Sequence, residues 1–73
     1  MNHFFFHKNL YFLRVRDGLT QKEMSRKLGS KDESSYRHYE KGTVPNIHKI
    51  KVLADFYKIS VDTLCYKDLS IEN

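Results

Sequence analysis

A chain of 73 residues is long enough for one small domain and too short for a separate effector domain. Its single cysteine, Cys65, excludes an internal disulfide framework and is typical of a reducing cytosol. The net charge of +4 is unevenly distributed: residues 1–51 contain 11 Lys/Arg and 5 Asp/Glu, a balance of +6, whereas residues 52–73 contain 2 and 4, a balance of −2. This basic first part favours a nucleic acid as partner.

The chain opens on aromatic residues that lead into a first predicted helix. Two apolar stripes share this helix: a core stripe of Phe6, Leu10 and Leu13, and a nearly opposite stripe of Phe4, Tyr11 and Val15, with Phe5 and Phe12 between them. A helix that is apolar almost all round is normally covered on more than one side. The pattern indicates a contact with another protein or a second copy through Phe4, Phe5, Tyr11 and Phe12, or else a loosely packed aromatic tail.

A second helix is predicted from its capping residues. Thr20 followed three residues later by Glu23 is a capping box, so the helix should begin at Gln21. Gly29 ends it where a positive φ is easiest to adopt. The apolar stripe of this helix consists of Leu19, Met24 and Leu28.

A third helix over residues 33–41 has two candidate caps. Ser30 with Glu33 would form another capping box, whereas Asp32 would cap a shorter helix, and we favour Asp32. At ~100° per residue, Tyr36 and Tyr39 lie about 60° apart on one face, beside Glu40. The opposite face gathers Ser34, Arg37, His38 and Lys41. These groups suit the reading of bases and phosphates, although an ordinary amphipathic helix with a solvated face would show the same pattern.

The rest of the chain predicts two scaffold helices. After a loop over residues 42–45, Asn46 can cap a fourth helix, and Ser60 can cap a short fifth one. Their apolar residues recur at helical spacing: Ile47, Ile50, Leu53, Ala54 and Tyr57 in the fourth, and Val61, Leu64 and Cys65 in the fifth. Residues 65–73 form a tail or a dimer contact.

In order and spacing, these segments resemble the Cro- and phage-repressor-like helix-turn-helix proteins of the XRE family. The resemblance is carried by Phe6, Leu10, Leu13, Arg14, GLTQKE at 18–23, MSRKLG at 24–29, SSYRHYEKG at 34–42, Pro45, Ile47, Ile50, Leu53, Ala54 and ISVDTL at 59–64. It implies an all-α fold, a compact five-helix bundle of the lambda-repressor-like type, with residues 1–73 as one domain and the motif at about 20–41. It also implies an ion pair between Arg14 and Glu40. One departure is that Gly42 lies thirteen residues after Gly29, one more than is usual in the family, which lengthens the turn near Ser30 and Lys31.

The residues and the resemblance together predict a sequence-specific regulator of transcription, of the repressor type found in phages and mobile elements, with double-stranded DNA as its partner. The third helix would enter the major groove. Its base-reading residues would be Glu33, Ser34, Arg37 and His38. Phosphates would be held by Gln21, Lys22, Lys41 and Thr43, with Gln21 also offering backbone donors at the start of its helix.

We expect a homodimer, because one recognition helix covers only a few base pairs. The last helix and tail, where relatives in the family dimerise, would supply Val61, Leu64, Tyr66, Leu69 and Ile71. An alternative function is a protein-interaction module on the same fold, such as an antitoxin, an anti-repressor or a switch partner, that uses the aromatic first helix.

Signals for other classes of protein are weak. His3 and His7 have the i, i+4 spacing of a helical metal pair, but no third ligand or HExxH motif accompanies them, so no metal site is predicted. There is no phosphate-cradling glycine loop, and we expect neither enzymatic activity nor a cofactor. The apolar run of residues 4–6 is too short for a signal peptide or a membrane span, which predicts a cytoplasmic protein without a membrane partner.

Overall fold

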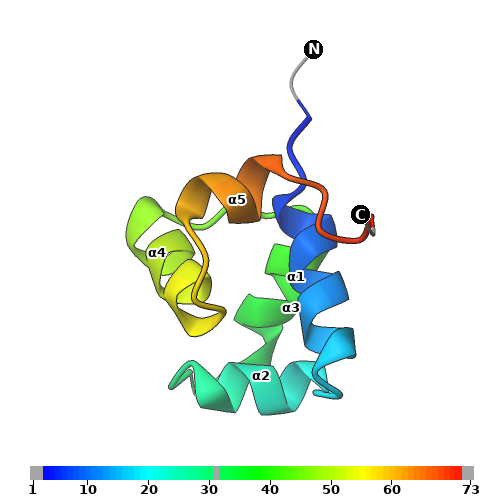
Figure 1. The fold of residues 1–73 in the computed structure, drawn as a ribbon. Helices are drawn as coiled ribbons and strands as arrows, with labels where there is room; N and C mark the ends of the chain where they lie inside the picture. The colour runs from blue at the N-terminus through cyan, green and yellow to red at the C-terminus, as the bar shows by residue number, and fades with distance from the viewer. Residues whose placement is uncertain (1–2, 31, 72–73) are drawn as a thin grey trace.

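The computed structural model describes residues 3–30 and 32–71. Within these ranges the regular secondary structure is all helix, joined by turns and short loops. The helices are α1 (Phe6–Arg16), α2 (Gln21–Lys27), α3 (Glu33–Lys41), α4 (Ile47–Phe56) and α5 (Val61–Tyr66). Figure 1 shows α3 in the middle, with α1 and α4 on either side of it, α2 across one end and α5 across the other. This arrangement confirms the predicted five-helix bundle.

Four helices begin at the side-chain caps that the sequence predicts. Thr20 and Glu23 form the complete capping box, in which the Thr20 hydroxyl accepts from the Glu23 amide at 3.0 Å and the Glu23 carboxylate from the Thr20 amide at 2.8 Å. Asp32, the favoured cap of α3, accepts from the Ser34 amide at 2.9 Å. Asn46 and Ser60 cap α4 and α5. Each cap stabilises its helix by about 1 kcal/mol, so local chemistry sets where these helices start.

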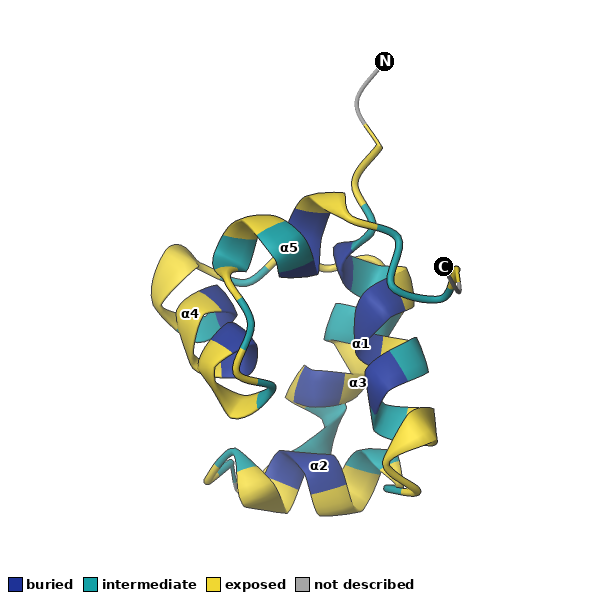
Figure 2. Cartoon of the chain, in the orientation of Figure 1, coloured by how far each residue is buried: buried dark blue, intermediate teal, exposed yellow. Residues whose placement is uncertain are grey.

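The core lies where the inner faces of the helices meet, as Figure 2 shows by burial. Its buried hydrophobic side chains are Phe6, Leu10, Leu13, Met24, Tyr36, Ile50, Leu53, Ala54, Leu64 and Cys65. Leu64 is 0% exposed, so its prediction as a dimer contact is wrong: the residue faces the core of its own chain. Cys65 is a free buried cysteine, and burial raises the pKa of its thiol.

The prediction that the first helix includes Phe4 and Phe5 is wrong, because α1 begins at Phe6. Phe4 and Phe5 precede α1, and the backbone amide of Phe5 donates to the Cys65 carbonyl at 2.6 Å instead of continuing a helix. Phe12 is half-buried against the core, while Tyr11 and Val15 are exposed as predicted. The apolar surface of α1 is therefore narrower than the sequence indicates.

Asn9 joins α1 to the end of α5 and the segment that follows it. It is fully buried, and its side-chain amide donates to the carbonyls of Leu64 at 2.7 Å and Lys67 at 2.6 Å while its oxygen accepts from the Leu69 amide at 3.0 Å. One side chain thus satisfies three backbone groups that the end of α5 leaves free. Residues 67–69 are held along α1, and Leu69 packs half-buried against the core.

Candidate nucleic-acid interface

The inner face of α3 is held by two tyrosines and a carboxylate. Tyr36 is 1% exposed, and its ring meets that of Tyr39 edge to face with centroids 6.3 Å apart. Burial, reinforced by the neighbouring Glu40 carboxylate, raises the pKa of the Tyr36 hydroxyl well above its usual range. The tyrosine therefore stays neutral and serves as packing, as the sequence predicts.

The predicted pair of Arg14 and Glu40 is present and bidentate. Arg14 Nε lies 2.6 Å from Glu40 Oε2 and Nη2 lies 3.1 Å from Oε1, while Nη1 donates to the Leu19 carbonyl at 2.7 Å. The side chains are 11% and 6% exposed. Because Arg14 belongs to α1 and Glu40 to α3, the pair fixes α3 against α1.

Gln21 adds a third helix to this cluster. Its amide nitrogen donates to Glu40 Oε1 at 3.0 Å, which ties the first turn of α2 to α3. Burial of Glu40 opposes ionisation, but the hydrogen bonds from Arg14 and Gln21 and the positive charge of Arg14 favour the carboxylate, and the pKa of this carboxyl lies below its ordinary value. The hydrogen bond from Arg14 to Glu40 raises the pKa of Arg14 in turn. We call Arg14, Gln21 and Glu40 the charged cluster.

The outer face of α3 carries the predicted base-reading residues. They fall into two groups that differ in exposure. Arg37 and His38 are exposed toward the C-terminal half, whereas Glu33 and Ser34 are half-exposed in the first turn. The Ser34 hydroxyl donates to Asp32 Oδ1 at 2.6 Å, and hydrogen bonds from Ser34 lower the pKa of Asp32. With its proton committed, Ser34 keeps lone pairs with which to accept from a base amino group.

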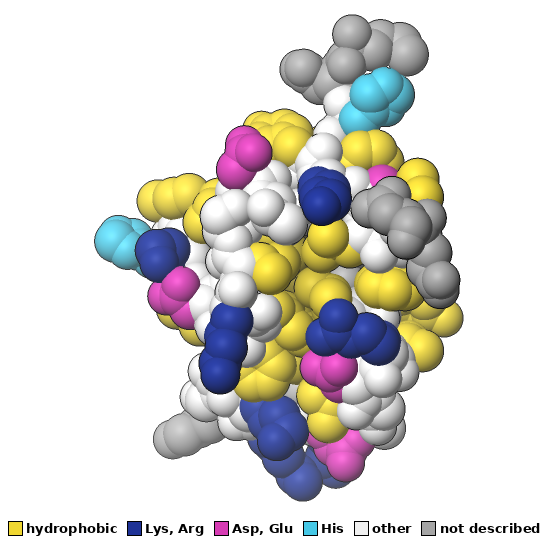
Figure 3. All heavy atoms as spheres, in the orientation of Figure 1, with side chains coloured by type: hydrophobic (Ala, Val, Ile, Leu, Met, Phe, Trp, Pro, Cys, Tyr) yellow, Lys and Arg dark blue, Asp and Glu magenta, His cyan; other side chains and the backbone are white. Residues whose placement is uncertain are grey.

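The four predicted phosphate-binding residues do not share one environment. Lys22, Lys41 and Thr43 are exposed, whereas the Gln21 side chain is half-buried and donates to Glu40. In the structure the Gln21 side chain therefore links α2 to α3, whereas the other three side chains are free to meet a phosphate. On the face drawn in Figure 3, Lys and Arg side chains are spread over several helices, with a group at the α2 end, and hydrophobic side chains fill the middle between the helices.

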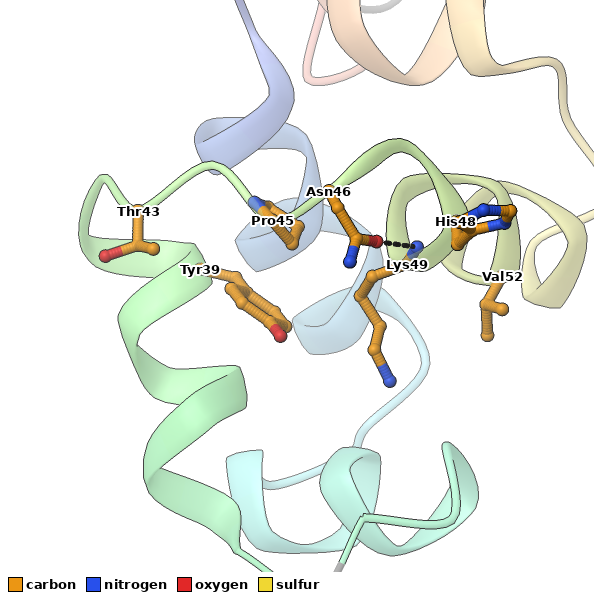
Figure 4. Close-up of a pocket in the computed structure, with 7 residues that line it drawn as sticks. All are labelled: Tyr39, Thr43, Pro45, Asn46, His48, Lys49 and Val52. Atoms are coloured by element: carbon orange, nitrogen blue, oxygen red, sulfur yellow. Dashed lines mark hydrogen bonds between the residues drawn. The ribbon is translucent and has the colours of Figure 1, made fainter.

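An open groove of about 520 Å³ lies between the end of α3 and the start of α4. It is lined by Tyr39, Thr43, Pro45, Asn46, His48, Lys49 and Val52. Figure 4 shows the Lys49 side chain extending from the start of α4 on one side of the groove, the Tyr39 ring on the other, and Thr43 beyond it. Lys49 and His48 were not among the residues predicted from the sequence, although their position just after the Asn46 cap places them in the first turn of α4.

Two further findings concern the described residues. Among residues 3–30 and 32–71, no three His, Cys, Asp or Glu side chains come together as a metal ion would need. Across the same ranges, none of the helices has the length and apolar character needed to cross a bilayer.

Comparison with known proteins identifies the class. The helix-turn-helix family of the Cro/C1 type, also called the XRE family, matches residues 10–64, and the chain belongs to this family. Membership implies a DNA-binding domain, and domains of this kind are typically not catalytic. No curated protein and no solved structure matches the chain.

Proposed function

We propose that this protein is a sequence-specific regulator of transcription, a repressor of the phage or mobile-element type, that reads the major groove with α3. The observation that carries the proposal is the division of α3: its inner face is held by Tyr36 and the charged cluster, while Arg37 and His38 point outward and are exposed. A rigid helix with free polar side chains on one face is what base reading requires.

The two halves of the outer face suit different base edges. Asp32 and Glu33 make the first turn acidic, so with Ser34 they favour the amino group of cytosine or adenine. Arg37 and His38 favour the acceptors of guanine. Lys22, Lys41 and Thr43 would then neutralise or bind phosphates, and Lys49 in the neighbouring groove joins them as a further candidate.

We further propose that the protein binds DNA as a homodimer through α5 and the tail. Tyr66 and Ile71 are 56% and 61% exposed, and the half-buried Val61 and Leu69 lie on the same two segments. The five helices share one core, which supports a single domain. A cytoplasmic location is proposed because it fits a DNA-binding domain. A complex of the parent with DNA that sediments as strictly one protein copy would refute the dimer, and a Tyr66→Glu variant with unchanged assembly would exclude this surface.

Selection of bound duplexes from a random DNA pool tests the function. A two-fold symmetric motif is expected, and failure to enrich any sequence would refute specific binding.

On the selected duplex, Arg37→Ala should relax preference at one base pair by about 1–3 kcal/mol. Lys41→Ala is the matched control, because it should weaken binding to all sequences equally and lower the salt slope by about one unit at most. A change of base preference in Lys41→Ala would exclude its phosphate role.

A second candidate is a protein-interaction module, favoured by one observation. Phe4, 38% exposed, contacts Tyr66 edge to face with ring centroids 5.7 Å apart. The aromatic start of the chain and α5, which the sequence treats as separate surfaces, therefore adjoin each other. Strong retention on heparin with release by moderate salt supports the DNA-binding candidate, and indifference to DNA supports the interaction module.

A further inference from the structure

One contact links the start of the chain to the end of the recognition helix. His7 Nδ1 lies 2.7 Å from the backbone carbonyl oxygen of Tyr39, across 32 residues of sequence. His7 precedes residue 10, where the match to the family begins. The contact is therefore supplied by a residue that lies before the matched range.

The Tyr39 carbonyl needs a partner from outside its helix. It belongs to the last turn of α3, whose carbonyls have no amide four residues further on within the helix. The Thr43 amide, which would be its partner if the helix continued, donates to the His38 carbonyl at 3.0 Å instead. Gly42 makes this turn possible with φ of +139°. Among the described residues, His7 is the group that donates to Tyr39.

The imidazole is held so that this donor points at α3. The His7 ring lies edge to face against Phe4 and Phe6, with centroid distances of 5.6 Å and 5.3 Å, and Phe6 is fully buried. A carbonyl oxygen can only accept, so Nδ1 must carry the hydrogen, and neutral His7 is the Nδ1–H tautomer. The buried Phe6 ring on one side and the Tyr39 carbonyl on the other hold the imidazole in one orientation.

We infer that His7 is a positioning residue for DNA binding, which caps the C-terminal end of α3 and thereby sets the place of His38 and Lys41. His38 precedes Tyr39 directly, and Lys41 follows two residues later, so both depend on how the last turn is held. The charged cluster anchors α3 through Glu40 on its inner side, and His7 anchors the backbone at its end. This inference rests on the proposed reading role of α3.

Two substitutions separate the hydrogen bond from the ring. His7→Phe keeps an aromatic ring between Phe4 and Phe6 but removes the donor, whereas His7→Asn removes the ring and keeps an amide N–H near the place of Nδ1. The matched control is His3→Phe, because His3 is exposed and stacks on Phe5 with centroids 5.8 Å apart. All three are full-length chains, compared with the parent on its selected duplex at a temperature where each is fully folded.

We expect His7→Phe to bind about two- to tenfold more weakly, the effect of one net hydrogen bond, and to lose preference at the base pair read by His38. His7→Asn should recover most of both, and His3→Phe should match the parent. Parent-like affinity and preference in His7→Phe would overturn the inference while leaving the proposed function intact. So would a loss in His7→Asn as large as in His7→Phe, because it would show that the ring alone matters.

The hydrogen bond can also be tested in the protein without DNA. Long-range ¹H–¹⁵N spectra of the parent with neutral imidazole rings should show the His7 proton on Nδ1, and a proton on Nε2 would overturn the inference. A parent that selects no duplex would refute the reading role of α3, and with it any role of His7 in DNA binding, whatever the tautomer.

Discussion

Two buried polar clusters hold this molecule together, and they differ in charge. The charged cluster joins α1, α2 and α3 around the Glu40 carboxylate. Asn9 joins α1 to α5 and the tail with one neutral amide. The first fixes α3 against α1 and α2, and the second fixes α1 against α5 and residues 67–69. Only the charged cluster contains a carboxyl, so only its contribution to stability can change with pH in the acid range.

The two clusters differ in how many hydrogen-bond partners a buried polar group needs. A buried carboxylate must be stabilised by several donors at once, because desolvation of the charge opposes its burial. A buried amide carries both donors and an acceptor, so Asn9 is satisfied by backbone groups alone. The helices α1, α2 and α3 are thus held by an arrangement that loses much of its stabilising effect when any one of its three members is missing.

The largest effect should come from breaking the charged cluster. Glu40→Ala leaves the Arg14 guanidinium without its carboxylate partner. We expect the free energy of unfolding to fall by about 3–5 kcal/mol, and by less if water hydrates the unpaired guanidinium. Urea denaturation measures this loss. The control is the double variant Arg14→Met with Glu40→Met, which removes both charges and should lose less than Glu40→Ala. A double variant that loses more would contradict this account of the cluster.

A smaller loss is expected from the neutral cluster. Asn9→Leu leaves the carbonyls of Leu64 and Lys67 without their donor, at a cost of about 1–3 kcal/mol. Hydrogen exchange should show the loss first at the Leu69 amide, which donates to Asn9. Lys8→Ala is the neighbouring control: its pair with Asp68 has Nζ 2.8 Å from Oδ2 with Lys8 55% exposed, so it should change stability by about 0–1 kcal/mol. Equal effects of the two variants would contradict a buried role for Asn9.

The third test uses pH to separate the clusters. Because the pKa of Glu40 is lowered in the folded protein, its contribution to stability is present above the ordinary value of 4.5 and is lost as pH falls through the folded pKa. Glu40→Gln should therefore flatten the acid limb of the stability curve, whereas Asn9→Leu should keep the parent's slope at a lower level. The smallest expected effect is this change of slope, measured by urea titrations between about pH 3 and 7. An unchanged slope in Glu40→Gln would show that other carboxyls control acid unfolding.

Much of the site was predictable because its determinants are local. Thr20, Asp32, Asn46 and Ser60 each bond an amide two or three residues away, so sequence spacing alone locates the starts of α2 to α5. Helical periodicity then separates the inward Tyr36 from the outward Arg37. The pair of Arg14 and Glu40 is a long-range contact, and it was predictable only through the resemblance to a family.

Other features were decided by the tertiary structure. Nothing in the spacing of Asn9 or His7 indicates that the first binds the tail and the second binds Tyr39, because their partners lie more than thirty residues away. Spacing also did not indicate that Gln21 bonds Glu40, 19 residues along the chain, or that Leu64 packs inward instead of at a dimer contact.

What the sequence by itself determined, then, is the set of helices, their caps and the two faces of α3. What only the tertiary structure decided is which backbone groups at helix ends are satisfied by distant side chains, and which apolar residues remain exposed. The physical reason is that caps and periodicity act within one or two helical turns, whereas the free carbonyls of α3 and α5 accept from whichever donor the packing of α1 brings near.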